Sequence, residues 1–181
     1  MLTGHPLRKL FAEFVSKSFH HQIHHYDSEM TQYLTDLLTG FTYAERLYKI
    51  RDAAGRRLDD VGELLIESNP LLAASSFDRE REVRKHIGNY TLFFTGLFPE
   101  YLKRPRRSLR LDYFVDYVKA GKESYGVVSK FDQFEYRKVA PLFRRLSENV
   151  ELCVFGLNLV RDELRRMQAR YYQHLERTLI T

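Results

Sequence analysis

The stretch His86-Ile-Gly-Asn-Tyr-Thr-Leu-Phe-Phe-Thr-Gly-Leu-Phe-Pro-Glu-Tyr101 is rich in large apolar and aromatic residues. Charged residues precede it, and Pro99 and the basic run from Lys103 to Arg107 follow it. Apolar residues of this region recur every three or four positions, at Val83, Ile87, Tyr90 and Phe94. This spacing is typical of the buried face of a helix. The sequence therefore predicts a central aromatic-rich helix near residues 77–98, around which the fold is built.

The remaining apolar residues follow the same helical period, and no segment alternates apolar and polar residues between turn signals. We therefore predict an all-α fold, a single-domain bundle of six or seven helices that covers residues 1–181. Pro6, Asp27, Thr42, Ser76 and Ser108 are the predicted helix starts. The third helix is expected to begin at Thr42, to carry its apolar stripe as far as Leu65 and to end at Asn69-Pro70. The last region is expected either to break near Ser147 to Asn149 or to form one long helix.

Composition sets limits on the class of protein. The 181 residues include 13 Phe, 12 Tyr and a single Cys, Cys153, which we interpret as a core residue. The N-terminus lacks the features of a signal peptide, and the apolar runs are too short to cross a bilayer, so we expect a cytoplasmic protein without membrane insertion. The formal net charge of +5 permits a polyanionic partner without specifying one.

The first candidate site lies on the central helix, where Glu82, His86, Asn89 and Phe93 share one side. A carboxylate four residues from an imidazole can orient it for proton transfer or ligand binding, or it can form an ordinary surface pair. Asn89 needs hydrogen-bond partners if it is buried. We interpret these four residues as a candidate pocket lining. Gly88, Thr91 and Thr95, on another side, indicate the close approach of a neighbouring helix.

The second candidate is the run from His20 to His25. If it is helical, His21 and His25 face inward and His20 and His24 face outward. A weak candidate metal site would then use His21 and His25 with carboxylates from another helix. The alternative is a solvated, His-rich helix end, and the sequence lacks the paired motifs of zinc or di-iron proteins.

The third candidate is basic. Lys103, Arg104, Arg106 and Arg107 form a predicted loop that could contact phosphate groups, and further arginines recur in the last helical region. Those later arginines have acidic neighbours, which favours a surface laced with ion pairs. No helix-turn-helix, zinc-finger or RNA-binding signature accompanies them.

We expect this sequence to encode a binding or assembly domain that encloses a small apolar ligand and forms a homo-oligomer. Phosphate-loop, nucleophile-elbow and catalytic-triad signatures are lacking, so the pattern favours binding over catalysis. One alternative is a metal- or haem-dependent enzyme or sensor that uses His21, His25, His86 and Glu82. Another is a nucleic-acid-associated protein that acts through residues 103–107. The sequence identifies no particular cofactor.

Overall fold

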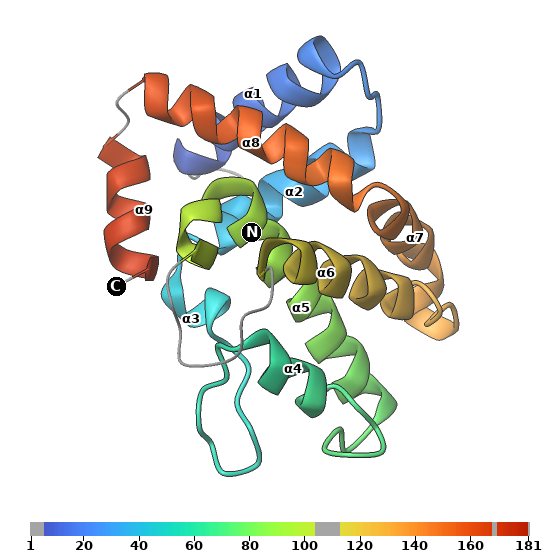
Figure 1. Cartoon of the computed structure of the whole chain (residues 1–181). Coiled ribbons are helices and arrows are strands. Elements are labelled where there is room, and N and C mark those ends of the chain that lie inside the picture. The colour runs from blue at the N-terminus through green and yellow to red at the C-terminus, as the bar shows by residue number, and fades with distance from the viewer. Residues whose placement is uncertain (1–5, 104–112, 168–169, 181) are drawn as a thin grey trace. The chain divides into compact units, whose positions relative to one another are not determined.

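The computed structural model describes residues 6–103, 113–167 and 170–180, and these ranges are helical with no strand among them (Figure 1). The prediction of an all-α fold is confirmed. The α-helices within the described ranges are α1 Pro6–Ser16, α2 Ser28–Gly40, α3 Ala44–Leu47, α4 Val61–Glu67, α5 Phe77–Leu97, α6 Tyr113–Val128, α7 Ala140–Glu148, α8 Val150–Arg166 and α9 Arg170–Ile180. The same ranges contain a π-helix, η1 Lys17–Gln22, and two 3₁₀-helices, η2 Pro99–Lys103 and η3 Phe134–Lys138. The predicted central helix is α5.

Two compact units emerge from the contacts between residues. The first unit contains Met1–Leu47, Phe93–Arg104 and Glu151–Thr181, and the second contains Tyr48–Leu92 and Pro105–Val150. The boundary therefore falls inside α5, after Leu92. The expectation of one domain over residues 1–181 stays a prediction.

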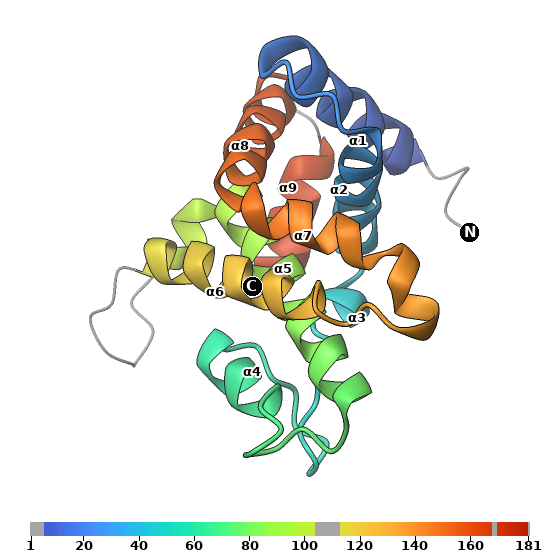
Figure 2. The ribbon, with the colours of Figure 1, turned by 90° about the vertical axis from the view of Figure 1, so that its right-hand side faces the viewer.

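In the first unit, α8 packs against the helices at the start of the chain (Figures 1 and 2). The Ser18 hydroxyl donates to the Gly156 carbonyl at 2.8 Å, and the Lys17 ammonium pairs with Glu163 at 3.0 Å. The buried rings of the end of α5 and its surroundings form a cluster with centroid separations from 4.6 to 6.4 Å: Phe41, Phe93, Phe94, Phe98 and Tyr101. These contacts tie η1 to α8 and pack Phe41 against the end of α5.

In the second unit, α5 and α6 approach closely where each carries a glycine. A Cβ atom on Gly88 would lie 2.5 Å from the Tyr125 ring, and one on Gly121 would lie 2.5 Å from the Thr91 hydroxyl. Neither distance leaves room for a side chain. The expected close packing at Gly88 and Thr91 is therefore confirmed. α7 packs beside α6, as Figure 2 shows.

The predicted helix over residues 42–65 is wrong. α3 ends at Leu47, and a loop with one antiparallel bridge between Arg51 and Arg57 leads to α4. Gly55 adopts a φ of +79°, and the Asp52 carboxylate accepts hydrogen bonds from the backbone of the turn at 2.9 and 3.0 Å. Asp60 then caps α4. Turn chemistry thus interrupts an apolar spacing that otherwise matches a helix.

Several other helix ends follow the predicted signals, but α3 begins at Ala44 rather than at Thr42. α1 begins at Pro6, and Asp27 caps α2 through a hydrogen bond from the Met30 backbone at 2.9 Å. The Ser76 hydroxyl accepts from the Arg79 backbone at 3.1 Å and caps α5. The last region breaks at Asn149, between α7 and α8. Ser108 lies outside the described residues.

A helix that spans a membrane needs about 20 consecutive, mostly apolar residues. None of the described helices meets this requirement.

Candidate functional site

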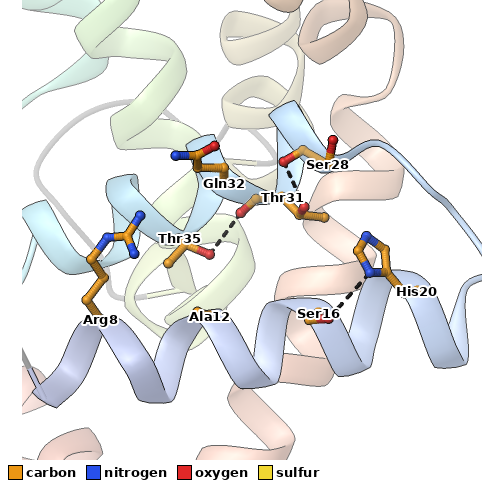
Figure 3. Close-up of a pocket in the computed structure, with 8 residues that line it drawn as sticks. All are labelled: Arg8, Ala12, Ser16, His20, Ser28, Thr31, Gln32 and Thr35. Atoms are coloured by element: carbon orange, nitrogen blue, oxygen red, sulfur yellow. Dashed lines mark hydrogen bonds between the residues drawn. The ribbon is translucent and has the colours of Figure 1, made fainter. Parts of the chain in front are cut away.

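A polar groove lies between α1 with η1 on one side and α2 on the other (Figure 3). It encloses about 330 Å³. Seven of its eight lining residues are polar, and none is acidic: Arg8, Ala12, Ser16, His20, Ser28, Thr31, Gln32 and Thr35. A groove of this volume is at the small end of the range of ligand sites in proteins.

The α1 side of the groove follows from a four-residue spacing. Arg8, Ala12, Ser16 and His20 succeed one another along one face, since residues four apart are neighbours on a helix. The adjacent face of α1 carries Phe11, Phe14 and Val15 into the apolar core. The small side chains in the middle of this row leave room between the two helices.

The α2 side carries a ladder of hydroxyl groups. Thr31 donates to the Ser28 carbonyl at 3.1 Å, and Thr35 donates to the Thr31 carbonyl at 2.8 Å (Figure 3). Threonine in a helix commonly satisfies its hydroxyl in this way. The hydroxyl protons of Thr31 and Thr35 therefore form hydrogen bonds within α2. Their oxygen atoms can still accept a hydrogen bond from another group.

His20 lies within a local change of helix type. The segment Lys17–Gln22 is wound as a π-helix, and the Ile23 backbone donates five residues back to Ser18 at 3.0 Å. The Nδ1 atom of His20 lies 3.3 Å from the Ser16 hydroxyl. Its Nε2 atom is enclosed and has no hydrogen-bond partner among residues 6–103, 113–167 and 170–180. The exposed Tyr26 ring stacks on the imidazole, with centroids 5.7 Å apart.

Arg8 stands at the other end of the groove. Its Nε donates to the Asp36 carboxylate at 2.9 Å. The two terminal nitrogens of Arg8 make no hydrogen bond to the part of the chain that the structure describes. They remain available as donors, while Asp36 balances the charge.

The histidine prediction is partly overturned by the same π-turn. His21 is exposed, so its expected inward orientation is wrong, and His20 rather than His21 faces the neighbouring helix. The helical spacing fails because His24 and His25 lie beyond η1, with His24 at a φ of 59°. Within the described residues, no three His, Cys, Asp or Glu side chains gather closely enough to hold a metal ion. The structure thus brings no set of further ligands to His21 and His25, and metal binding there stays a prediction.

Among the candidates on α5, Glu82 is engaged in ion pairs at the surface. Its carboxylate lies 3.1 Å from the Lys49 ammonium and 3.3 Å from the Arg79 guanidinium. Partial burial pushes the pKa of Glu82 upward, but the hydrogen bond and charge of Lys49, helped by Arg79, hold it below its ordinary value. Glu82 is therefore an ionised partner of two cations.

The other three α5 candidates have different surroundings. His86 is buried, with its ring centroid 5.9 Å from that of Tyr90. Asn89 accepts a hydrogen bond from the Tyr125 hydroxyl at 2.8 Å, which supplies a partner that the sequence led us to expect. Phe93 belongs to the first unit and packs in its aromatic cluster. The groove between α1 and α2 is not lined by any of these residues.

The basic candidate lies largely outside the described residues. Arg104, Arg106 and Arg107 fall in residues 104–112, and Lys103 is the last residue of η2. The later arginines form ion pairs: Arg161 with Asp162 at 3.0 Å, Arg165 with Glu100 at 2.6 Å, and Arg166 with Glu163 at 2.9 Å. The α8 arginines are thus a salt-bridged surface.

The groove residues were missed in the sequence. Their signal is faint but present: small or polar residues recur every four positions at Ala12, Ser16 and His20, and threonines recur at Thr31, Thr35 and Thr39. Neither row identifies a site until the two helices are known to pack together. Comparison with protein-family models, curated proteins and solved structures finds no match for this chain.

Proposed function

We propose that this chain is a ligand-binding protein, and that the polar groove between α1 and α2 is its ligand site. The observation that supports this most directly concerns His20, a residue that lines the groove and whose enclosed Nε2 atom has no hydrogen-bond partner in the described protein. A buried nitrogen without a hydrogen bond costs about 1–3 kcal/mol. A bound ligand that supplies the missing partner would recover this free energy.

The remaining groove residues support the same proposal. Gln32 makes no side-chain hydrogen bond within the described ranges, and its amide offers both donor and acceptor atoms at the groove. Thr31 and Thr35 present acceptor oxygens, and Arg8 presents donors. Proteins usually orient a small ligand with a small number of polar groups that face the cavity.

The proposal replaces the expected apolar ligand with a polar one and moves the site from α5 to α1 and α2. On α5, Glu82 pairs with two cations and Asn89 bonds with Tyr125. These groups have roles within the fold. A cytoplasmic location, a homo-oligomeric state and nucleic-acid binding through residues 103–107 stay predictions from the sequence.

The test is protein-observed NMR of the full chain with a panel that contains glucose, glutamate, arginine and octanoate among other polar and apolar compounds. We expect a polar compound to shift backbone signals of α1 and α2. His20→Ala should weaken that binding about tenfold or more, since it removes a hydrogen bond in an enclosed site. His21→Ala is the matched control, because His21 is the exposed neighbour outside the groove. If no compound shifts these signals, or if both variants bind equally well, the proposal is wrong.

A further inference from the structure

The arrangement of hydrogen-bond donors and acceptors in the groove restricts the chemistry of its ligand. We infer that the groove binds a small acidic polyol, a molecule that carries several hydroxyl groups and one carboxylate or phosphate group. This inference rests on the proposed function and makes it specific. The inference depends on which hydroxyl protons of the groove already form hydrogen bonds within the protein.

The first step concerns the middle of the groove. The hydroxyl protons of Thr31 and Thr35 are directed to carbonyl groups of α2, at 3.1 and 2.8 Å. Their oxygens can therefore only accept further hydrogen bonds. A ligand that pairs with them must bring donors, and hydroxyl groups at successive carbons supply such donors along a row. An apolar ligand or a bare anion would leave both oxygens unpaired.

The second step concerns His20. The Ser16 hydroxyl makes its only side-chain hydrogen bond among the described residues with Nδ1 of His20, at 3.3 Å. The hydroxyl proton needs an acceptor, so the favoured assignment has Ser16 donating to Nδ1. Nε2 then carries a proton in the neutral ring and is a donor without an acceptor. The ligand must place an acceptor at this end.

The third step concerns charge. Arg8 lines the groove, and its partner Asp36 does not. No lining residue is acidic, so an anionic group meets no like charge among the groove walls. Hydrogen bonds to an ionised acceptor are roughly twice as strong as neutral ones. The acidic group is placed at the His20 end, because Nε2 lacks an acceptor there, whereas Asp36 already balances the charge of Arg8.

Tyr26 controls access to that end. Its ring covers the imidazole of His20, yet it is 74% exposed and its hydroxyl lies 3.5 Å from His24. A side chain with so few contacts can rotate at small cost. Rotation of Tyr26 would remove the ring that stacks on this imidazole.

The test uses calorimetric titration and NMR of the full chain with five probes: gluconate, glucose 6-phosphate, glucose, inorganic phosphate and octanoate. We expect gluconate or glucose 6-phosphate to bind about tenfold or more tightly than glucose, because a charge-assisted hydrogen bond is added. Gluconate alone would assign a carboxylate, and glucose 6-phosphate alone a phosphate. Phosphate without hydroxyl groups and octanoate should bind weakly or not at all.

Two variants separate the contribution of His20 to ligand binding from that of the Thr31 hydroxyl. His20→Ala should remove the preference for the acidic sugar over glucose, so that the ratio of affinities falls toward one. Thr31→Val, which keeps the shape and removes the acceptor, should weaken glucose and the acidic sugar by similar factors of about threefold or more. His21→Ala should change neither. A merely structural role of His20 would weaken all probes alike.

The outcomes distinguish this inference from the proposed function. If glucose binds as tightly as both acidic sugars, or octanoate binds most tightly, the acidic-polyol inference is overturned. If none of the five probes binds but other polar compounds of the panel shift α1 and α2 signals, the inference also fails while the binding function stands. If nothing shifts those signals, both are wrong.

Discussion

The groove between α1 and α2 and two polar residues of α5, Glu82 and Asn89, differ in how their polar groups are paired. On α5, Asn89 accepts from Tyr125 at 2.8 Å, and Glu82 lies within 3.3 Å of two cations. In the groove, His20 Nε2 has no partner in the described ranges, and the Thr31 oxygen keeps acceptor capacity. A polar residue beside a core can thus complete the fold or remain available to a ligand. Its hydrogen bonds, not its type or spacing, decide which.

The largest expected effect is on the reactivity of the Cys153 thiol, which lies against the core side of α2. Met30 Sδ lies 3.6 Å from Cys153 Sγ, and burial raises the pKa of the Cys153 thiol to about 12. At pH 8 the thiolate population is therefore about a thousandfold lower than for an ordinary thiol, and iodoacetamide should modify the folded protein at least that much more slowly than the urea-unfolded chain.

Mass spectrometry of timed samples measures this rate. Thr31→Val should keep the same protection, which would show that a loss of ligand binding in that variant does not come from displacement of α2. Rapid modification of Cys153 in the folded wild-type protein would contradict the described packing.

The second prediction tests how closely α5 packs against α6. Gly88→Ala should lower the free energy of unfolding by about 1–3 kcal/mol, although alanine favours helices, because the new methyl group meets the buried Tyr125 ring. Urea unfolding followed by circular dichroism measures the change. Gly40→Ala is the matched control, since its methyl group would make an ordinary contact with Arg46 at 3.7 Å. Equal effects of the two substitutions would disprove the close approach of α5 and α6.

The third effect compares one hydroxyl from each region. Tyr125→Phe removes the hydrogen bond to Asn89 and should lower the free energy of unfolding by about 1 kcal/mol without changing ligand binding. Thr31→Val in the groove should cost about 0.5 kcal/mol or less and weaken ligand binding. Urea unfolding and calorimetric titration measure the two properties. The reverse pattern would exchange the roles that we assign to the two regions.

The smallest effect concerns a cation on α5. Burial lowers the pKa of Lys85, and the charges of Arg81 and Lys49 lower it further. Between this lowered pKa and the ordinary value of 10.5, the unfolded chain binds more protons than the folded protein. The contribution of Lys85 to the free energy of unfolding therefore rises with pH across that window.

Lys85→Met should remove this contribution, so the free energy of unfolding should rise less between pH 8 and pH 10.5 than in the wild-type protein. Urea unfolding at a series of pH values measures the slope. Lys119→Met serves as the control, because that side chain is largely exposed. An unchanged slope in Lys85→Met would show that Lys85 is not buried as described.

Much of the fold could be predicted because its boundaries depend on local chemistry. Pro6, Asp27 and Ser76 start helices through effects that act within a few residues. The segment 42–65 failed because its apolar spacing continues through a turn that Asp52 and Gly55 fold locally. Hydrophobic periodicity alone cannot reveal a turn when the apolar residues on both sides of it keep a helical spacing.

The site could not be predicted in the same way. The groove requires α1 and α2 to lie side by side, which depends on tertiary packing. The α-helical assumption directed His21 inward, whereas the structure leaves it exposed. Polar rows on separate helices become a site only when packing brings them together.

The π-turn of η1 also has an evolutionary consequence. A π-turn is equivalent to one extra residue in an α-helix, and such turns are frequent at functional sites. Deleting one residue between Lys17 and Gln22 would restore α-helical bonding and rotate the residues that follow by about 100°. Two related chains could then differ in whether they form the groove although they share all of its lining residues. A sequence alignment would show this difference as a one-residue gap.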